Sequence, residues 1–369
     1  MNPVTALDVF AGVGWGVACQ WLGVREYGVE IAKSAIRLRA ANGMRTIYRD
    51  VWSGLFHEHL VPEHDLYIAS PPCQTFSMAG KGGGRKALED VLRAIDEHHH
   101  EDAARLHELT ESLDPRTALV LTPLAHIYRH RPRLVALEQV PEVLPVWHAY
   151  ANVMRGLGYS VRVEIMRSEQ YGVPQTRKRA ILMARLDGKI QPPAATHSRF
   201  YPTNPDRLDP GVEKWVTMAD ALGWGMTNHP YLTIASGRET GGPNKEKVGG
   251  SAARAKIYAE LDAGRWVFER PATTVVGTFS PHMISAPGHR DFKTVSRQDV
   301  DGSVRVSLEQ AAALQSFPAD FKWRGTKTAK FLAVGNAVPP LMAAAILGAL
   351  LAPPAERDAW DNVFAAVAG

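Results

Sequence analysis

The chain has 369 residues, 45% of them hydrophobic and 22% charged, a composition that can bury a large core and is not typical of a disordered protein. This length predicts about two domains, and a net charge of +4 with a pI near 9.0 is compatible with a polyanionic partner. Two cysteines exclude a disulfide framework and a four-cysteine zinc site. The longest apolar run, 341–352, is too short to cross a bilayer, and no basic segment typical of a secretory signal precedes the first apolar stretch. We therefore expect a soluble, cytoplasmic protein without membrane contact.

Short apolar runs alternate with helix-like stretches along the first half of the chain, which is the pattern of a mostly parallel α/β sheet. The expected strands span 4–10, 26–29, 45–49, 66–69, 134–137 and 180–184. Helices are expected after the glycine turn as far as Trp21, over 32–41, within the polar segment 86–113, and over 308–315 and 341–351. From 191 to about 269 the periodicity fades, and Pro, Gly, Asn and Trp become more frequent. We therefore predict a first domain over 1–188 with an insertion at 81–113, a smaller irregular domain over 189–269, and a return to the first domain over 270–369.

A glycine turn follows the first expected strand, in the sequence DVFAGVGWG at 8–16. Glycine lets a backbone approach a ligand closely because it has no Cβ and accepts unusual dihedral angles. Position 17 is Val where a dinucleotide-binding turn needs a small residue, so a pyrophosphate site is disfavoured. Glu30 and Asp50 end the next two strands, where carboxylates suit ribose hydroxyls and an amine but repel phosphate. The pattern predicts a nucleoside ligand without phosphates; an ordinary strand–helix turn with solvated acids is the alternative.

Cys73 follows the expected strand 66–69 and two prolines, and a glycine-rich segment comes after it. Because proline fixes φ, this cysteine is placed like a nucleophile at the carboxyl end of a strand. A free cysteine is more often a small buried hydrophobic residue, but that role needs neither a rigid double-proline approach nor a polar loop afterwards. Cys19 lies among apolar neighbours on the first helix and fits the buried, structural role.

Charged side chains stand next to two further strands. Glu138 ends an apolar strand, and partial loss of solvent there favours a protonated carboxyl that can donate a proton; a capping or solvated acid is the alternative. Arg177 and Arg179 precede the strand 180–184 and share one face of an extended backbone, so both could reach one site; a solvated basic run is the alternative. The three histidines at 98–100 lie among acids in a polar helical segment, and we interpret them as solvated, with no metal bound.

Taken in order, these segments resemble the motifs of the C5-cytosine-specific DNA methyltransferase family. Its first motif is similar to DVFAGVGWG, its catalytic Pro-Cys motif to PPCQTFS at 71–77, its Glu-Asn-Val motif to LEQV at 137–140 and its Gln-x-Arg-x-Arg motif to QTRKR at 175–179. The last two motifs are similar to RPATT at 270–274 and GNAVPP at 335–340. The resemblance implies a Rossmann-like, S-adenosylmethionine-dependent methyltransferase fold, α/β with a mostly parallel sheet, and a target-recognition domain over 189–269.

The resemblance also implies S-adenosylmethionine as the methyl donor, S-adenosylhomocysteine as its product and double-stranded DNA as the partner. Cys73 would attack carbon 6 of a cytosine flipped out of the duplex, Glu138 would contact or protonate ring nitrogen 3, and carbon 5 would take the methyl group. Arg179 would hold the base or the thiolate region and Arg177 the neighbouring backbone. The expected DNA contacts are Gln74, Ser77, Gln175 and Thr273. The expected cofactor contacts are Asp8, Phe10, Ala11, Gly12, Gly14, Glu30, Ile31, Asp50, Val51, Pro72, Asn336 and Ala337.

One motif departs from the family pattern. Gln139 stands where the family has Asn, which lengthens a side chain that normally anchors the loop of the acid; we expect activity to survive. Two alternatives stay open: an RNA methyltransferase that uses the same motifs on transfer RNA, and a catalytically weakened DNA-binding regulator, which only Gln139 supports. The irregular segment 189–269 favours duplex DNA over RNA. We expect a monomer in a bacterial or phage-infected cell, with a cognate restriction endonuclease as a candidate partner.

Overall fold

A computed structural model of the chain describes residues 3–72, 83–222, 271–273, 283–284, 304–305 and 307–353. The chain divides into two compact units. The first unit comprises Met1–Met166, Lys178–Ala194 and Ala343–Gly369, and the second comprises Arg167–Arg177 and Ala195–Met342. Each unit is therefore built from segments that are far apart in the sequence.

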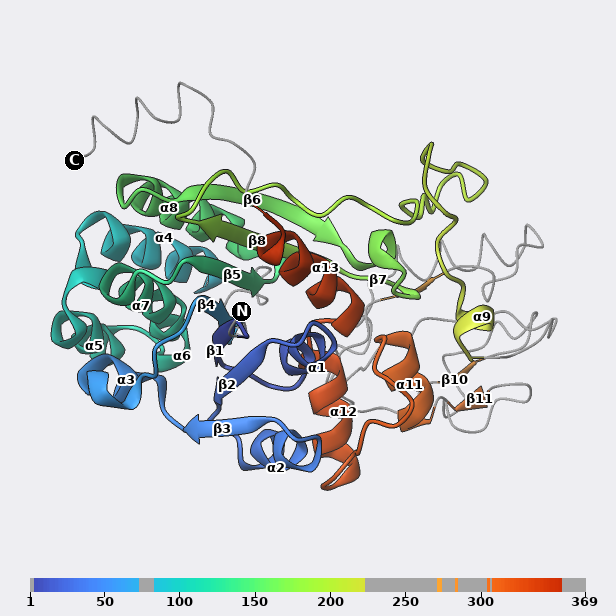
Figure 1. Cartoon of the computed structure of the whole chain (residues 1–369), viewed down its shortest axis with the longest axis horizontal. Helices are drawn as coiled ribbons and strands as arrows, with labels where there is room; N and C mark the ends of the chain where they lie inside the picture. Colours follow the sequence, from blue (N-terminus) through green and yellow to red (C-terminus); the bar gives the residue numbers. More distant parts are fainter. Residues whose placement is uncertain are drawn as a thin grey trace. The chain divides into compact units, whose positions relative to one another are not determined.

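A seven-stranded sheet forms the centre of the first unit (Figure 1). Its strands lie in the order β3-β2-β1-β4-β5-β8-β6. Their bounds are β1 Thr5–Val9, β2 Arg25–Val29, β3 Arg45–Tyr48, β4 Leu66–Ala69, β5 Leu134–Gln139, β6 Ser160–Arg167 and β8 Lys178–Arg185. The first five strands pair in parallel, and β8 runs antiparallel to β5. The chain order reverses between β1 and β4, the place in an open α/β sheet where ligands bind at the carboxyl ends of the strands.

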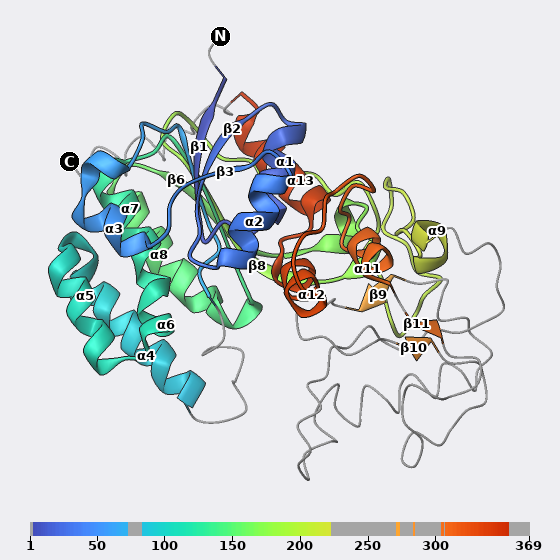
Figure 2. The same cartoon turned by 90° about the horizontal axis from the view of Figure 1, so that it is seen from below.

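Helices cover both faces of this sheet (Figure 2). One face carries α1 Gly14–Trp21, α2 Lys33–Ala41 and the part of α13 (Pro340–Leu351) that belongs to the first unit. The other face carries α3 Val51–Phe56, α4 Gly83–Asp96, α5 Ala103–Ser112, α6 Pro115–Ala118, α7 Thr122–His130 and α8 Leu144–Gly156. Short 3-10 turns join some of these elements: η1 Glu58–Leu60, η2 His99–Glu101, η3 Leu119–Leu121 and η4 Pro141–Val143.

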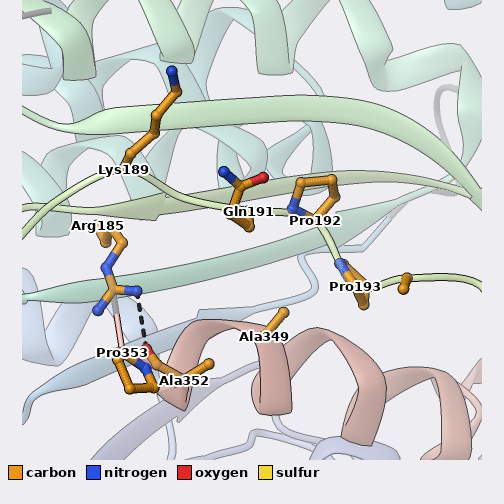
Figure 3. Close-up of a pocket in the computed structure, with 9 residues that line it drawn as sticks. Arg185, Lys189, Gln191, Pro192, Pro193, Ala349, Ala352 and Pro353 are labelled. Atoms are coloured by element: carbon orange, nitrogen blue, oxygen red, sulfur yellow. Dashed lines mark hydrogen bonds between the residues drawn. The ribbon is translucent and has the colours of Figure 1, made fainter. Parts of the chain in front are cut away.

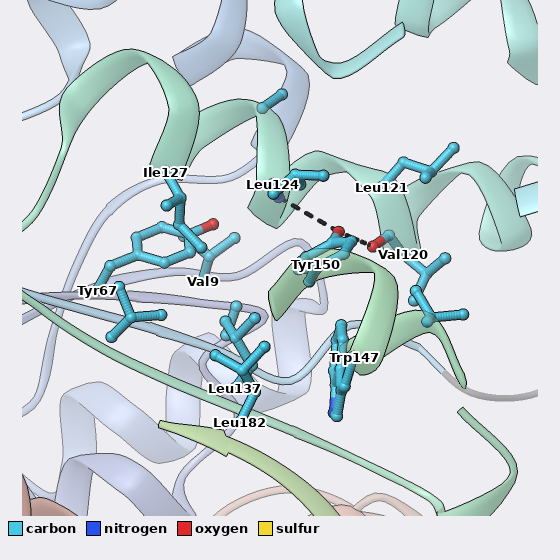
Figure 4. Packing of buried hydrophobic residues seen from close by; sticks show 14 of the residues in the cluster. Val9, Tyr67, Val120, Leu121, Leu124, Ile127, Leu137, Trp147, Tyr150 and Leu182 are labelled. Atoms are coloured by element: carbon cyan, nitrogen blue, oxygen red, sulfur yellow. Dashed lines mark hydrogen bonds between the residues drawn. The ribbon is translucent and has the colours of Figure 1, made fainter. Parts of the chain in front are cut away.

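The core of the first unit lies between the sheet and α4–α8 (Figure 4). Tyr67, Leu137 and Leu182 contribute from three adjacent strands, and Trp147 and Tyr150 contribute from α8. The polar atoms of both α8 aromatics are satisfied: the indole N–H of Trp147 donates to the Ala180 carbonyl at 3.1 Å, and the Tyr150 hydroxyl donates to the Val120 carbonyl. Trp147 and Tyr150 are therefore buried without orphaned donors, whereas the buried Tyr67 hydroxyl has no hydrogen-bond partner among the described residues.

The second unit is described in pieces. Its elements are η5 Ser168–Tyr171, β7 Gln175–Thr176, α9 Met218–Leu222, β9 Ala272–Thr273, β10 Met283–Ile284, β11 Val304–Arg305, α11 Leu308–Leu314 and α12 Lys327–Asn336. β7 pairs in parallel with β9, and β10 pairs antiparallel with β11. Ser307 begins α11 with a capping box, in which its side chain and that of Gln310 each accept from the other residue's backbone N–H.

The expected α/β fold with a mostly parallel sheet is confirmed, and all six expected strands are present within a few residues. Strand β6 was not predicted, although Val161, Val163 and Ile165 alternate with Arg162 and Glu164 as a half-buried strand requires. The polar segment 86–113 is not one helix, because η2 separates α4 from α5. Gly335 and Asn336 of the GNAVPP motif end α12, and Pro340 begins α13.

The segment Lys327–Leu351 has the length and hydropathy of a membrane span, and 61% of its apolar window is buried inside the structure. It consists of α12 and α13, which are separated at 337–339.

Candidate active site

The candidate site lies at the carboxyl ends of the parallel strands of the first unit. The register pairs Val9 of β1 with Val29 of β2 and with Ala69 of β4, and Ala69 with Leu137 of β5. The residues that follow these positions, Phe10, Glu30, Ser70 and Glu138, therefore stand along one edge of the sheet. Three of the predicted chemical motifs begin at this edge.

The glycine turn between β1 and α1 has an unusual backbone. Phe10 and Gly12 both have positive φ, at 58° and 49°. This conformation is unfavourable for Phe10 because its Cβ clashes with the backbone, whereas glycine has no Cβ. Beside Gly12, the place that a Cβ would occupy is open space. The backbone N–H of Ala11 donates to the Val29 carbonyl at 3.1 Å, which fixes the turn to β2. At the switch point of the sheet Gly12 is half-buried, whereas Ala11 and Gly14 are buried.

Glu30 is held by the backbone on both sides of the candidate site. Its Oε2 accepts from the Gly12 N–H at 3.0 Å, and its Oε1 accepts from the Ala32 N–H at 2.8 Å. A carboxylate has about four acceptor positions, so these two bonds orient Glu30 and leave it able to accept from a ligand. The next residue, Ile31, is 65% exposed, which places an apolar side chain beside this carboxylate.

Asp50 stands at the end of β3 and caps α3. Its Oδ1 accepts from the Trp52 N–H at 3.2 Å, so the capping role is present in the structure. Val51, expected to contact the cofactor together with Asp50, is the first residue of α3 and is buried. The side chain of Asp50 itself is exposed at the same edge as Glu30.

Asp8 was expected to contact the cofactor, but its carboxylate is fully buried. It lies 4.0 Å from the guanidinium of Arg39, which also pairs with Glu26 at 2.5 Å and donates to the Gly12 carbonyl at 3.3 Å. Burial, together with the neighbouring carboxylate, raises the pKa of Asp8 well above its usual range. The role of Asp8 is therefore revised to support of the turn from beneath, through Arg39.

Glu26 and Arg39 were not identified from the sequence. The signal that could have found them is Gly28, an isolated glycine inside β2, since such a glycine often marks a close approach of another group. Arg39 reaches from α2 across this position, where a Cβ would collide with its guanidinium. The guanidinium also donates to Thr46 Oγ1 at 3.1 Å, so one side chain joins α2, β2, β3 and the turn.

The segment that leads to Cys73 is tied down at two points. The Trp15 indole N–H donates to Ser70 Oγ at 2.9 Å, and the Gln139 side-chain amide donates to the Pro71 carbonyl. Gln139 thus reaches from the end of β5 to the residue two positions before Cys73. Although its side chain is longer than the Asn of the family, it still anchors a neighbouring segment. Cys73, Gln74 and Ser77 lie outside the described residues, which include Pro72 but none of 73–82.

Glu138 forms a close ion pair at the end of β5. The Arg179 Nε lies 2.7 Å from Glu138 Oε1, and the two side chains are only 13% and 8% exposed. Arg179 also donates to the Lys178 carbonyl at 2.7 Å. The pairing of Glu138 with Ile181 in the antiparallel β5–β8 register brings these side chains together. A partly desolvated pair of this kind holds a carboxyl in one orientation at the sheet edge.

Other predicted residues belong to the second unit. Arg177 is buried and donates to the Gly335 carbonyl at 3.0 Å, so it has a structural partner of its own. The side-chain amide of Gln175 is fully buried and donates to Leu314 O at 3.3 Å and to the Gln315 side chain. A DNA contact was expected for Gln175; because its amide is enclosed within this unit, that expectation is revised to a structural role.

Three further predicted residues, Asn336, Ala337 and Thr273, also belong to the second unit. Asn336 is exposed at the end of α12, and Ala337 is buried with its carbonyl accepting from Gln315 Nε2 at 2.8 Å. Thr273 pairs with Thr176 through the backbone, and its side chain lies outside the described residues.

A pocket in the first unit lies at the other edge of the sheet (Figure 3). Its lining residues are Arg185, Lys189, Gln191, Pro192, Pro193, Ala194, Ala349, Ala352 and Pro353. Arg185 pairs with Leu134, the first residue of β5, whereas Glu138 is near the last. The Arg185 guanidinium donates to the Ala352 carbonyl at 3.1 Å and to Asp187 at 2.6 Å. This pocket is therefore separate from the candidate active site.

The sequence profile of the C-5 cytosine-specific DNA methylases matches residues 4–98 and 108–352. The chain belongs to this family. The DNA methylase profile covers every predicted motif and leaves only 99–107 unmatched between its two parts. The resemblance inferred from the motifs is thus confirmed, and so is the prediction that the chain is an enzyme, a cytosine-5 DNA methyltransferase.

Individual relatives agree with this assignment. The chain is 28% identical over 298 residues to the type II methyltransferase M1.HphI of Haemophilus parahaemolyticus, across 78% of this chain and 68% of that protein. It is 25% identical to the type II methyltransferase M.AplI of Arthrospira platensis, across 94% of this chain and 85% of that protein.

Solved structures show the same fold. A putative DNA modification methyltransferase encoded within an Escherichia coli prophage matches 94% of this chain and 98% of its own, with 19% identity and a TM-score of 0.54. The Entamoeba histolytica methyltransferase EhMeth matches 95% and 98%, with 14% identity and a TM-score of 0.56. The expected methyltransferase fold is confirmed, and the family implies a methyl donor of the S-adenosylmethionine type.

Proposed function

We propose that this methylase transfers a methyl group from S-adenosylmethionine to carbon 5 of cytosine in a specific duplex DNA sequence, with Cys73 as the nucleophile. The observation that carries the proposal is the hydrogen bond from Gln139 to the Pro71 carbonyl. It joins the end of β5, where Glu138 stands, to the backbone two residues before Cys73. The candidate acid and the residues that lead to the candidate nucleophile are thus joined at one end of the sheet.

The residues at the glycine turn suit this donor. When bound, S-adenosylmethionine would supply an electrophilic methyl group on a sulfonium centre. Glu30, oriented by the Gly12 and Ala32 amides, would accept hydrogen bonds from the ribose hydroxyls, and the exposed Ile31 would cover the adenine. Asp50 would face the adenine amine, and Phe10, Ala11, Gly14, Val51 and Pro72 would complete the part of the site that belongs to the first unit. Asn336 and Ala337 remain the cofactor contacts that the GNAVPP motif implies. Carboxylates at this edge disfavour a phosphorylated nucleotide.

Cys73 would act on a cytosine that has left the base stack, because the edge of the base cannot be reached in the duplex. Its thiolate would form a bond to carbon 6, and the electron pair of the 5,6 double bond would shift toward carbon 5. Carbon 5 would then take the methyl group and lose its proton to a solvent base. The electron pair left by that proton would re-form the double bond as the Cys73–carbon 6 bond breaks.

Glu138 and Arg179 would serve the first of these steps. Glu138 would contact or protonate ring nitrogen 3, which withdraws electrons from the ring and makes carbon 6 more reactive. The 2.7 Å ion pair supports this role because Arg179 fixes the carboxyl at the sheet edge before the base arrives. Arg179 would also stand beside the base itself.

The segment 189–269 would read the target sequence as a target-recognition domain. It carries ten Lys and Arg and nine Asp and Glu, so its recognition would depend on a few basic side chains at base edges rather than on net charge. We propose a monomeric enzyme in the cytoplasm, on DNA, that protects sites from a cognate endonuclease, as the type II character of the relatives suggests.

The test begins with bisulfite sequencing of DNA from cells that express the chain, which identifies the methylated sequence. A duplex with 5-fluorocytosine at that position should then form a covalent complex that survives denaturation, because carbon 5 has no proton to lose. Peptide mapping should place the attachment at Cys73. Attachment elsewhere, or none, would contradict the proposed nucleophile.

The matched variant is Cys73→Ala, which should form no covalent complex and still bind S-adenosylmethionine. If cofactor binding disappears as well, Cys73 has a structural role. Methylation of transfer RNA without methylation of DNA would identify the RNA-directed alternative. Cofactor binding by the wild-type chain without any trapping would identify the weakened regulator.

A further inference from the structure

The turn between α4 and α5 carries a cluster of His and Glu side chains that the methyl transfer does not use. The three consecutive histidines were expected to be solvated, but His100 is only 2% exposed. It belongs to η2, and its ring contacts that of Tyr128 on α7 edge-on, with centroids 5.5 Å apart. The family profile leaves 99–107 unmatched, so this part of the chain is additional to the family pattern.

Three of these side chains converge. One ligand atom from each of His98, His100 and Glu101 lies within 4.8 Å of the other two. His98 Nδ1 and Glu101 Oε1 are already 3.1 Å apart. In a tetrahedral zinc site with bonds of about 2.0–2.2 Å, two ligand atoms are about 3.3–3.5 Å apart. Small side-chain rotations would therefore bring the three atoms around one ion.

The inner member of the cluster has no partner for its ring. Neither Nδ1 nor Nε2 of His100 makes a hydrogen bond within the described part of the chain, and both atoms are buried. A buried polar group without a partner is unfavourable, whereas a neutral imidazole nitrogen is a common metal ligand.

We propose that His98, His100 and Glu101 bind one divalent transition-metal ion of the zinc class, with water in the fourth position. Two imidazoles and one carboxylate are a ligand set that zinc accepts. The ion would fix the connection between α4 and α5. The site lies in the first unit outside the residues of methyl transfer, so it stands or falls independently of the proposed function.

The experiment uses the full chain, stripped of metal by a chelator and titrated with zinc chloride in a calorimeter. We expect one ion per chain, and a rise in the thermal unfolding midpoint on saturation. The variant is His98→Ala with Glu101→Gln, two exposed side chains whose loss leaves the packing intact. Its zinc affinity should fall by at least about 10–100-fold, since even outer-shell changes at metal sites cost this much.

The matched control is His57→Ala with His59→Ala. These exposed histidines have ring centroids 5.8 Å apart, almost the 5.7 Å that separates His98 from His100, but within the described part of the chain they belong to no group of three converging ligand side chains. The control should keep full affinity and the thermal shift. Absence of binding to the wild type, equal affinity in the His98/Glu101 variant, or an equal loss in the control would each overturn the proposal.

Discussion

Two adjacent residues at the end of β5 have different partners. Glu138 pairs with Arg179 on β8, whereas Gln139 donates to the Pro71 carbonyl beyond β4. The peptide bond between them therefore links the candidate acid to the approach of the candidate nucleophile. Each partner can be tested separately because each contact depends on one side chain.

We expect Glu138→Gln to slow methyl transfer by about 10²–10⁴-fold, the usual cost of losing a positioned acid. Cofactor affinity should be unchanged, since Glu30 and the glycine turn are untouched. Single-turnover rates and calorimetric cofactor binding measure the two quantities. The control is Glu142→Gln, an exposed acid in η4. A rate near that of the wild type would exclude Glu138 as the acid.

We expect Gln139→Leu to reduce kcat by about 10–100-fold, because a small misplacement of a catalytic group has effects of this size. Leucine keeps much of the volume and removes the hydrogen bond to Pro71. Gln139→Asn, with a shorter reach, should fall between the two. Steady-state kinetics on the identified duplex measure the effect. If all three chains have the same kcat, the anchoring of Pro71 does not limit the reaction.

At the scale of elements, α2 is joined to the sheet by charge as well as by apolar packing. Arg39 is fully buried and faces two carboxyl groups, Asp8 and Glu26. Burial raises the pKa of both carboxyl groups. The charge of the Arg39 guanidinium is balanced when one of the two acids is ionised and the other keeps its proton. Any other state leaves an unbalanced buried charge, which is unfavourable.

We expect Arg39→Met to lower the free energy of unfolding by about 3–5 kcal/mol, since it leaves buried carboxyl groups without their cation. Adding Glu26→Gln should restore part of this loss, because the remaining carboxyl Asp8 can stay protonated. Urea unfolding measures both variants. Arg37→Met, an exposed position on the same helix, should change little. No recovery in the double variant would contradict the charge argument.

A second polar cluster joins the start of β4 to α7. His64 and His126 have their Nε2 atoms 3.1 Å apart, the His126 ring stacks on Tyr67 with centroids 4.2 Å apart, and the His130 ring lies 4.3 Å from that of His126. Burial lowers the pKa of His64, His126 and His130. Burial therefore favours the neutral form of all three rings in the folded protein.

Stability should depend on pH through this cluster. In the unfolded chain these histidines take up protons near their ordinary pKa of about 6.5. In the folded chain they take up protons only at a lower pH, because burial lowers their pKa. The contribution of these neutral histidines to the free energy of unfolding is fully present above the ordinary pKa. It is lost as the pH falls below that pKa, by up to about 1.4 kcal/mol per pH unit for each histidine. Urea midpoints at pH 8 and pH 5.5 measure the loss. A His64→Gln/His130→Gln variant should lose less; an equal loss would exclude the cluster as its cause.

Sequence patterns predicted the elements that depend on neighbours along the chain. The strands 66–69 and 134–137 are apolar runs, and the glycine turn follows from its own residues. Contacts such as Arg39 with Gly12, Gln139 with Pro71, and the burial of His100 depend on which elements the fold brings together. Hydrophobic periodicity does not contain that information. Arg39 was therefore missed, and His100 was predicted to be solvated.

At the scale of the whole molecule, methyl transfer and recognition of the DNA target sequence are proposed for different parts of the chain. The residues proposed for the chemical steps, Cys73, Glu138 and Arg179, belong to the first unit. The proposed target-recognition segment, 189–269, lies almost entirely in the second unit. This separation predicts that specificity can change without a change in the reaction.

We expect an exchange of 189–269 for the corresponding segment of M.AplI to move methylation to the target sequence of that protein. Bisulfite sequencing of DNA from expressing cells measures the outcome. The catalytic rate on the new site should remain within about tenfold of the original, because the residues that act on the base are kept. Methylation at the original sequence would place recognition outside the exchanged segment.

The hydrogen bond from Trp15 to Ser70 has a consequence for how the two proposed ligands affect each other's binding. Trp15 belongs to the helix that begins at the glycine turn, and Ser70 immediately precedes the proline pair. A molecule that immobilises one of these segments has already met part of the entropic cost of immobilising the other. Thermodynamic reciprocity then requires that occupancy by the donor and capture of the acceptor base strengthen each other by the same factor.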